Sequence, residues 1–127
     1  MIKAEKLNKA LIALEKIYLK PNQEDRSNID ATIRRFEFVF ELFWKPLKEV
    51  FNHQGIQVHY PREVIKEAFS SNLIDNEEIW LQMLQDRNLT SHTYDEALAD
   101  IVFSHIKLYV PIIKEAFNLV SKTIKAD

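Results

Sequence analysis

The stretch at residues 29–53, IDATIRRFEFVFELFWKPLKEVFNH, is the strongest indication of the fold because it is the longest part of the chain with the periodicity of a helix. Apolar side chains recur in it at steps of three and four residues, which places them along one face of an α-helix. These side chains are Ile33, Phe36, Phe40, Phe43, Leu47 and Val50. The pattern predicts a central core helix that Pro46 bends, because proline lacks an N–H group, and that Gly55 ends.

More apolar side chains lie outside this face, and they are Phe38, Val39, Leu42, Trp44 and Phe51. A helix that is apolar on two sides must be buried on two sides, and we do not expect one small bundle to cover both. We therefore predict a homodimer, in which the second side of this helix and the polar stretch described below lie together against the partner subunit. The alternative is a wide apolar face that is covered entirely within the chain.

A row of charged residues that includes Glu37 and Glu41 occupies the rest of this helix. Such a row is usually solvated. Two carboxylates among so many aromatic side chains are also suited to orient a buried Arg, and the pattern alone does not choose between these interpretations.

Helical patterns also occur in four other segments, which are residues 2–19, 61–70, 76–88 and about 94–124. Pro61 suits the first position of its helix, where the missing N–H group is not needed. Asp75 is followed three residues later by Glu78, and Thr93 by Glu96, which is the spacing of a capping box. These two pairs predict the starts of the last two helices.

The composition favours an all-α protein of one domain, spanning residues 1–127. The chain has one Gly and four Pro, which leaves little material for the turns of β-hairpins. A formal net charge of −2 provides no global basic field, so any contact with RNA must be local. Cys is absent, which excludes disulfides and thiolate chemistry. No signal peptide is recognised and no apolar run approaches the roughly 18 residues of a membrane span, so we expect a cytoplasmic protein without membrane contact.

A polar stretch at residues 87–94, RNLTSHTY, lies between the last two helical segments and collects groups that can do chemistry. Arg87 supplies a planar, permanently charged fork that suits phosphate. His92 can take or give a proton near neutral pH, and Tyr94 adds a hydroxyl. Together these residue types point to phosphate esters as ligands or substrates.

Arg87 and His92 would lie roughly 500° apart around one continuous helix and would point to different sides. We therefore predict a break between them, with a phosphate bound between Arg87 and the N-terminus of the next helix. In the alternative interpretation, Asp86 and Asp95 pair with Arg87 on the surface, where ion pairs contribute little, and His92 is an ordinary loop residue.

The remaining histidines do not indicate a metal site. His105 falls among apolar residues and is interpreted as a core histidine with satisfied hydrogen bonds rather than a site residue. His53 and His59 flank the loop that contains Gly55, but no carboxylate stands at ligand spacing. We predict neither a metal nor a cofactor.

Three motifs give the chain its resemblance to a known family. They are FEFVFELFWK at residues 36–45, PREVIKEA at 61–68 and DRNLTSHTY at 86–94. With them the chain resembles the nucleotidyltransferase substrate-binding protein family, a branch of the HEPN superfamily that includes HepT-like toxins. The last motif fits the Arg-x4-His-x-Tyr pattern of the HepT-like members, and the resemblance covers nearly the whole chain. Pro46 is a departure from the pattern and puts the straightness of its helix in doubt.

This resemblance implies an up-and-down bundle of four or five helices, usually dimeric, that works beside a separately encoded minimal nucleotidyltransferase. In the toxin-like members, the family's Arg and His, here Arg87 and His92, form a metal-independent ribonuclease site where two protomers meet. The family's Tyr, here Tyr94, is where the transferase attaches AMP to silence the toxin. We count Asn88, Glu37 and Glu41 as supporting residues.

The resemblance implies a second function as well. The chain would then be a non-catalytic subunit that uses the same residues to hold a nucleotide or polynucleotide phosphate for the transferase. A third alternative is a purely structural role, in which Arg87 ties two helices together.

Overall fold

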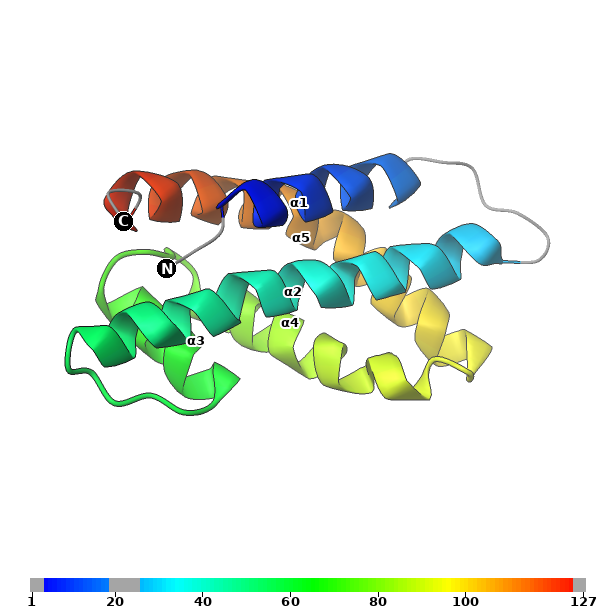
Figure 1. The fold of residues 1–127 in the computed structure, drawn as a ribbon. Coiled ribbons are helices and arrows are strands. Elements are labelled where there is room, and N and C mark those ends of the chain that lie inside the picture. Colours follow the sequence, from blue (N-terminus) through cyan, green and yellow to red (C-terminus); the bar gives the residue numbers. More distant parts are fainter. Residues whose placement is uncertain (1–3, 19–25, 125–127) are drawn as a thin grey trace.

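The computed structural model describes residues 4–18 and 26–124. Five α-helices and one short 3₁₀ helix make up the fold, and none of the described residues forms a β-strand (Figure 1). In chain order the elements are α1 (Ala4–Tyr18), α2 (Ser27–His53), α3 (Pro61–Ser70), α4 (Glu77–Leu89), η1 (Thr90–His92) and α5 (Glu96–Ile124). The all-α class is confirmed.

The long helices alternate in direction, so that α1, α2, α4 and α5 form an up-and-down bundle (Figure 1). Helix α1 packs on α2 and α5, and α2 contacts every other element of the bundle. Helix α3 lies against α2 and α4 at one end, while η1 connects α4 to α5 at the other end. The predicted bundle architecture is therefore confirmed, with α2 as its central helix.

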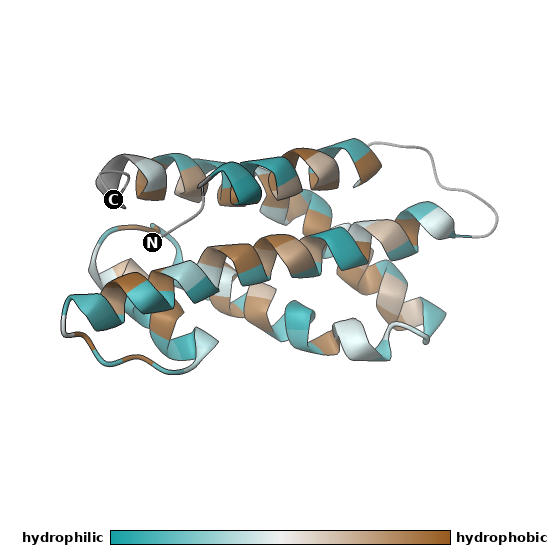
Figure 2. Ribbon diagram, in the orientation of Figure 1, coloured by the Kyte–Doolittle hydropathy of each residue, from teal (hydrophilic) through white to brown (hydrophobic). Residues whose placement is uncertain are grey.

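Helix α2 is covered on both of its apolar sides within one chain. Val39 is fully buried, and Trp44 and Phe51 are 8% and 2% exposed. Of the side chains outside the main face, Phe38 alone stays largely open, at 41% exposed, and Leu42 is half-buried against the core. The expectation that one bundle could not cover this helix was wrong, because α1, α3, α4 and α5 pack around it from several directions. Apolar residues accordingly line the interior of the bundle (Figure 2).

The ends of α2 and α3 follow the sequence signals. Gly55 has a φ of +85°, a conformation that glycine adopts without strain, and follows the last residues of α2 as predicted. Pro61 is the first residue of α3. The Glu63 carboxylate accepts hydrogen bonds from the backbone N–H groups of His59 and Tyr60, at 2.7 Å and 3.0 Å. These two bonds favour the charged carboxylate and lower the pKa of Glu63 below its usual value.

The predicted caps of α4 and α5 were each wrong in the choice of residue. Asn76, not Asp75, caps α4, and its side-chain oxygen accepts from the N–H of Ile79 at 3.1 Å. Asp95, not Thr93, caps α5, and its carboxylate accepts a hydrogen bond from the N–H of Leu98 at 3.3 Å. Both alternatives have a side chain with the same capping chemistry. The residue at which the backbone enters each helix therefore determines which of the two side chains caps it.

None of the helices in residues 4–18 and 26–124 combines the length and the apolar character needed to cross a membrane.

Candidate functional site

The polar stretch at residues 87–94 spans the last turn of α4, the helix η1 and the approach to α5. Helix α4 ends at Leu89, and α5 does not begin until Glu96, so the predicted break between Arg87 and His92 is confirmed. The chain turns through η1 instead, where the Thr93 hydroxyl donates to the carbonyl of Thr90 at 3.0 Å. This turn separates the motif into a half-buried part and an exposed part.

Arg87 belongs to the half-buried part and is held by α2. Its Nη2 lies 2.5 Å from Oε2 of Glu41, and its Nη1 donates to Oδ1 of the neighbouring Asn88 at 3.1 Å. The Arg87 and Glu41 side chains are 27% and 22% exposed. Glu41 also accepts from the indole N–H of Trp44 at 3.1 Å and pairs with Lys45 at 3.1 Å. Of the two interpretations of the charged row, the contact of Glu41 with Arg87 agrees with the one in which a carboxylate of α2 orients an Arg.

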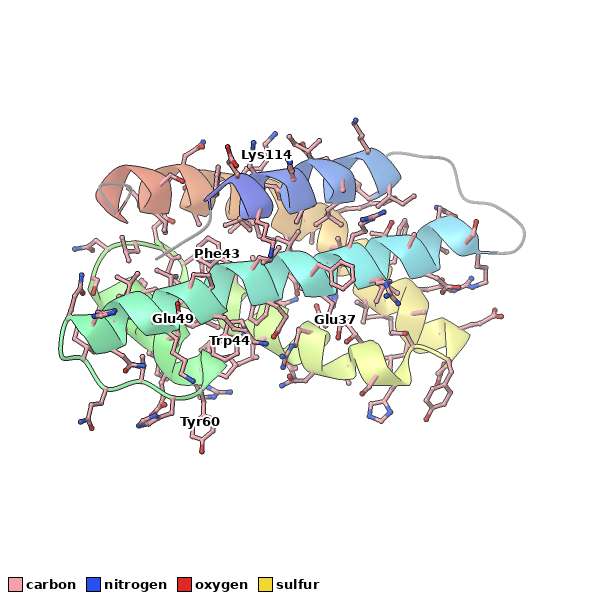
Figure 3. The ribbon with its side chains drawn as sticks, in the orientation of Figure 1. Glu37, Phe43, Trp44, Glu49, Tyr60 and Lys114 are labelled. Atoms are coloured by element: carbon pink, nitrogen blue, oxygen red, sulfur yellow. The ribbon has the colours of Figure 1, made fainter. Side chains whose placement is uncertain are left out.

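Glu37 supports the same junction from one turn earlier on α2, on the side that faces α4 (Figure 3). Its carboxylate lies 3.3 Å from the hydroxyl of Thr90, which also donates to the carbonyl of Arg87 at 2.7 Å. Two carboxylates of α2 therefore contact the end of α4 and the start of η1.

His92 and Tyr94 form the exposed part of the motif. Their rings meet edge to face with centroids 6.1 Å apart, and Tyr94 is 84% exposed. Across the described residues, no hydrogen bond or ion pair joins Arg87 to either of them. Tyr94 also lines a surface hollow of about 450 Å³ whose other walls come from α2 and the turn, at Asp30, Ile33, Arg34, Glu37, Thr90 and Thr93.

The partner of Arg87 is not Asp86, contrary to the surface-pair interpretation. Asp86 is only 4% exposed and points to α5, where its Oδ2 lies 2.8 Å from Nδ1 of His105 and accepts a hydrogen bond from the hydroxyl of Tyr109. Burial, and then the bond to Asp86, raise the pKa of Tyr109 far above its usual value, so this hydroxyl remains a donor.

The polar trio of Asp86, His105 and Tyr109 was not predicted, because His105 was interpreted as a core histidine, whereas its side chain is 32% exposed. The carboxylate is 19 and 23 residues away from its two partners, so no local pattern joins them. One signal was present, because His105 and Tyr109 stand four residues apart on one helix and share a face. A pair of this kind on one helix face can indicate that both side chains contact the same buried polar residue.

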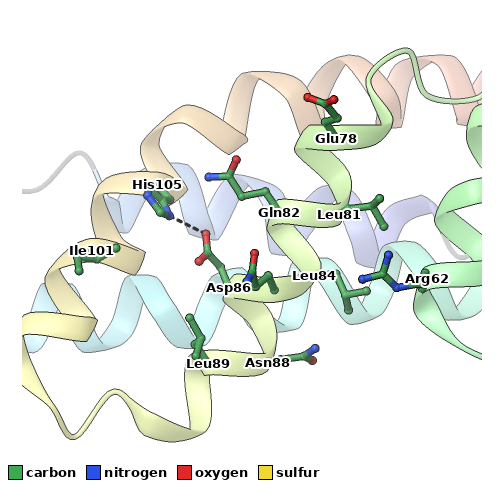
Figure 4. Close-up of a pocket in the computed structure, with 11 residues that line it drawn as sticks. Arg62, Glu78, Leu81, Gln82, Leu84, Asp86, Asn88, Leu89, Ile101 and His105 are labelled. Carbon is green, nitrogen blue, oxygen red and sulfur yellow. Dashed lines mark hydrogen bonds and ion pairs between the residues drawn. The ribbon is translucent and has the colours of Figure 1, made fainter.

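The trio lies beside a surface groove of about 760 Å³ between α4 and α5, with α3 at one end (Figure 4). Its lining consists of Arg62, Glu78, Leu81, Gln82, Leu84, Gln85, Asp86, Asn88, Leu89, Ile101 and His105. In the part of the chain that the structure describes, no three His, Asp or Glu side chains converge as a metal site would require.

The chain thus combines a helical bundle with an Arg-x4-His-x-Tyr motif at the turn into its last helix. Residues 3–122 match the family described as nucleotidyltransferase substrate binding protein like. The chain belongs to this family.

Particular relatives carry names of their own. The chain is 31% identical over 93 residues to the probable ribonuclease HepT of Haemophilus influenzae Rd, an alignment that covers 69% of this chain and 64% of that relative. A solved structure from Thermus thermophilus superposes with a TM-score of 0.79 at 32% identity, over 88% of this chain and 96% of that one. Another solved structure, from Haemophilus influenzae, superposes with a TM-score of 0.77 at 25% identity, over 91% of this chain and 97% of that one. It is described as revealing the fold of a substrate binding domain of a nucleotidyltransferase.

Proposed function

We propose that the protein is the partner of a separately encoded minimal nucleotidyltransferase and acts as a metal-independent ribonuclease, the toxin of a toxin–antitoxin pair. The observation that carries this proposal is the way Arg87 is held. Glu41 and Asn88 fix its guanidinium at the end of α4, directly before the turn that presents His92 and Tyr94 to solvent. The name of the Haemophilus relative, probable ribonuclease HepT, supports the same activity.

The proposed reaction is transesterification of RNA. Neutral His92 removes the proton of a ribose 2′-hydroxyl, the 2′-oxygen forms a bond to phosphorus, and the bond from phosphorus to the 5′-oxygen breaks. The leaving 5′-oxygen takes a proton from water or from a group of a second protomer. Arg87 stabilises the charge that develops on the phosphate oxygens. The products are a 2′,3′-cyclic phosphate and a free 5′-hydroxyl, and no metal is needed.

Tyr94 is proposed as the point of regulation. Tyr94 is 84% exposed, and its hydroxyl could attack the α-phosphorus of ATP held by the transferase, forming a phosphodiester to AMP and releasing pyrophosphate. The attached group would place a bulky anion two residues from His92, beside the hollow that Tyr94 lines. RNA would then be excluded from the motif.

A homodimer completes the proposal, because each chain contributes only one His to the motif. We place the dimer face at α2 and the motif. On this helix Phe38 is the large apolar side chain that stays exposed, with the Arg34 guanidinium 5.3 Å from its ring centre.

The direct test is cleavage of a mixed RNA pool by purified protein in EDTA. Wild type should yield fragments ending in 2′,3′-cyclic phosphate, whereas His92→Ala and Arg87→Ala should lower the rate at least a hundredfold. His59→Ala, which removes an exposed histidine outside the motif, is the matched control and should cut normally. Absence of cleavage by wild-type protein whose intact mass shows no added AMP would overturn the ribonuclease assignment.

A second function is favoured by the description of the Haemophilus influenzae structure as revealing the fold of a substrate binding domain of a nucleotidyltransferase. In this case the chain binds a nucleotide or polynucleotide phosphate at Arg87 and does not cut it. Wild type would then show no cleavage, and Arg87→Ala would weaken binding of nucleotide or of the transferase itself. If both motif variants lower only the melting temperature, the role of Arg87 is structural.

A further inference from the structure

In the trio of Asp86, His105 and Tyr109, only Nδ1 of the His105 ring has a hydrogen-bond partner among residues 4–18 and 26–124, and Nε2 has none there. Both donors converge on a single carboxylate oxygen of Asp86, and an ionised carboxylate can only accept hydrogen bonds. Nδ1 of His105 is therefore a donor, and in the neutral ring the lone pair is on Nε2. Figure 4 shows His105 on α5 with its bond to Asp86, at the wall of the groove.

His105 does not serve only as a packing residue of the core. The Asp86 side chain is 6% exposed whereas that of His105 is 32% exposed, so the carboxylate is inside and the ring reaches the surface. Tyr109 is 1% exposed and stacks on Phe36 with ring centroids 5.6 Å apart. Burying a carboxylate costs free energy unless its partners are well placed. Here the contact with Asp86 holds the His105 ring in one direction and, when the ring is neutral, keeps its hydrogen on Nδ1.

The lining of the groove matches the chemistry of a nucleotide. Apolar side chains, among them Leu89 and Ile101, provide surface for the flat faces of a base. Side-chain amides offer donors and acceptors for its edge, and they belong to Gln82, Gln85 and Asn88. Arg62 provides a cation suited to phosphate, and Glu78 is the one acid of the lining outside the trio. The volume of about 760 Å³ lies within the range of small-molecule sites, roughly 300–1,000 Å³.

The groove also adjoins the motif. Asn88 lines the groove, and its Oδ1 accepts the hydrogen bond from Nη1 of Arg87. A ligand that contacts the Asn88 amide would therefore lie next to the guanidinium proposed to act on phosphate.

We propose that the groove between α4 and α5 binds a nucleotide unit, and that His105 Nε2 accepts a hydrogen bond from a hydroxyl or amine of that ligand. Asp86 and Tyr109 are positioning residues, since they act only through the ring. The ligand is either a free nucleotide or one nucleotide of an RNA strand, which share this chemistry. The inference rests on the proposed function for its ligand class but uses a separate set of side chains.

The test is a titration followed by NMR, with AMP as one probe and a six-nucleotide single-stranded oligoadenylate as the other. His105→Gln should weaken binding about tenfold, since its amide can still donate to Asp86 but offers no ring nitrogen. His59→Gln is the matched control and should bind normally. Ile101→Glu, at an exposed position of the lining, should weaken binding of the anionic ligand, whereas Ile12→Glu on α1 should not.

A spectroscopic signature separates positioning from simple packing. In wild type, at a pH at which the His105 ring is neutral, the ¹⁵N resonance of Nε2 should be that of an unprotonated acceptor and should move when the probe is added. Asp86→Asn presents an amide donor to Nδ1, so the ring hydrogen should move to Nε2 and binding should fall in a protein that remains folded. Tyr109→Phe, which leaves Asp86 in place, should preserve the tautomer.

Binding of both probes identifies a free-nucleotide site, and binding of the oligonucleotide alone identifies an RNA subsite. The proposal is overturned if neither probe at millimolar concentration shifts resonances of the groove, or if His105→Gln binds as tightly as wild type. The two proposals fail in different ways. RNA cleavage that is unchanged in His105→Gln with no groove binding removes only this inference, whereas AMP binding without any RNA cleavage removes only the ribonuclease.

Discussion

At the scale of single residues, three neighbours at the end of α4 have different surroundings. Asp86 is bonded to α5, Arg87 is paired with α2, and Asn88 lines the groove. Successive residues of a helix are rotated by about 100°, so one turn can serve three surroundings. The motif is thus a junction at which α2, α4 and α5 are joined by side-chain polar contacts.

The pair of Arg87 and Glu41 provides a prediction at this scale. Glu41→Gln should lower the free energy of unfolding by about 1–2 kcal/mol, because a half-buried guanidinium loses its charged acceptor. The melting temperature should fall by roughly 3–10 °C, read by circular dichroism. Lys45→Gln removes only the exposed cation that Glu41 also contacts and should cost less than about 0.5 kcal/mol. Equal losses in the two variants would mean that Arg87 is not held by this carboxylate.

At the scale of the elements, the helix starts show what a sequence signal can specify. The capping-box spacing of Asp75 with Glu78, and of Thr93 with Glu96, located the beginnings of α4 and α5 to within a few residues. It did not identify the capping side chains, because neighbouring candidates such as Asp75 and Asn76 have almost the same preference for the position. The direction in which the preceding loop arrives selects one of them.

The cap of α4 can be tested with these two neighbours. Asn76→Ala should destabilise the protein by about 1 kcal/mol, because the N–H of Ile79 loses its acceptor. Asp75→Ala should change the free energy of unfolding by less than about 0.5 kcal/mol, since Asp75 is exposed and precedes the cap. Urea denaturation of both variants provides the comparison. The reverse order of the two effects would show that Asp75 caps the helix in solution.

At the scale of the whole molecule, coverage of α2 within one chain changes the basis for expecting a dimer. The buried Val39, Trp44 and Phe51 leave no second apolar side to cover. The proposed dimer therefore depends on smaller exposed features, which are Phe38 on α2 and the motif. Helix α5 also exposes apolar side chains, with Ile101 at 51% and Leu108 at 67%.

Light scattering at about 50 µM should report twice the 15.0 kDa mass of one chain. Phe38→Glu should shift the protein toward the monomer, because a charge cannot be buried unpaired in an interface. Ile12→Glu, a similar change on α1, should leave the mass unchanged. A wild-type monomer would refute the dimer, and a dimer lost only in Leu108→Glu would move its face to α5.

Local signals in the sequence are sufficient to specify the helical class, the five helices and the break in the motif. These depend on local periodicity, on Gly and Pro, and on the rotation between Arg87 and His92, all of which act within a few residues. Tertiary structure alone decided that Arg87 pairs with Glu41, that Asp86 joins His105 and Tyr109, and that one bundle covers α2. The sequence contains several carboxylates of similar chemistry that could have paired with Arg87. Only the packing of α2, α4 and α5 brings particular ones within hydrogen-bond distance, because residues far apart in the chain meet when the bundle closes.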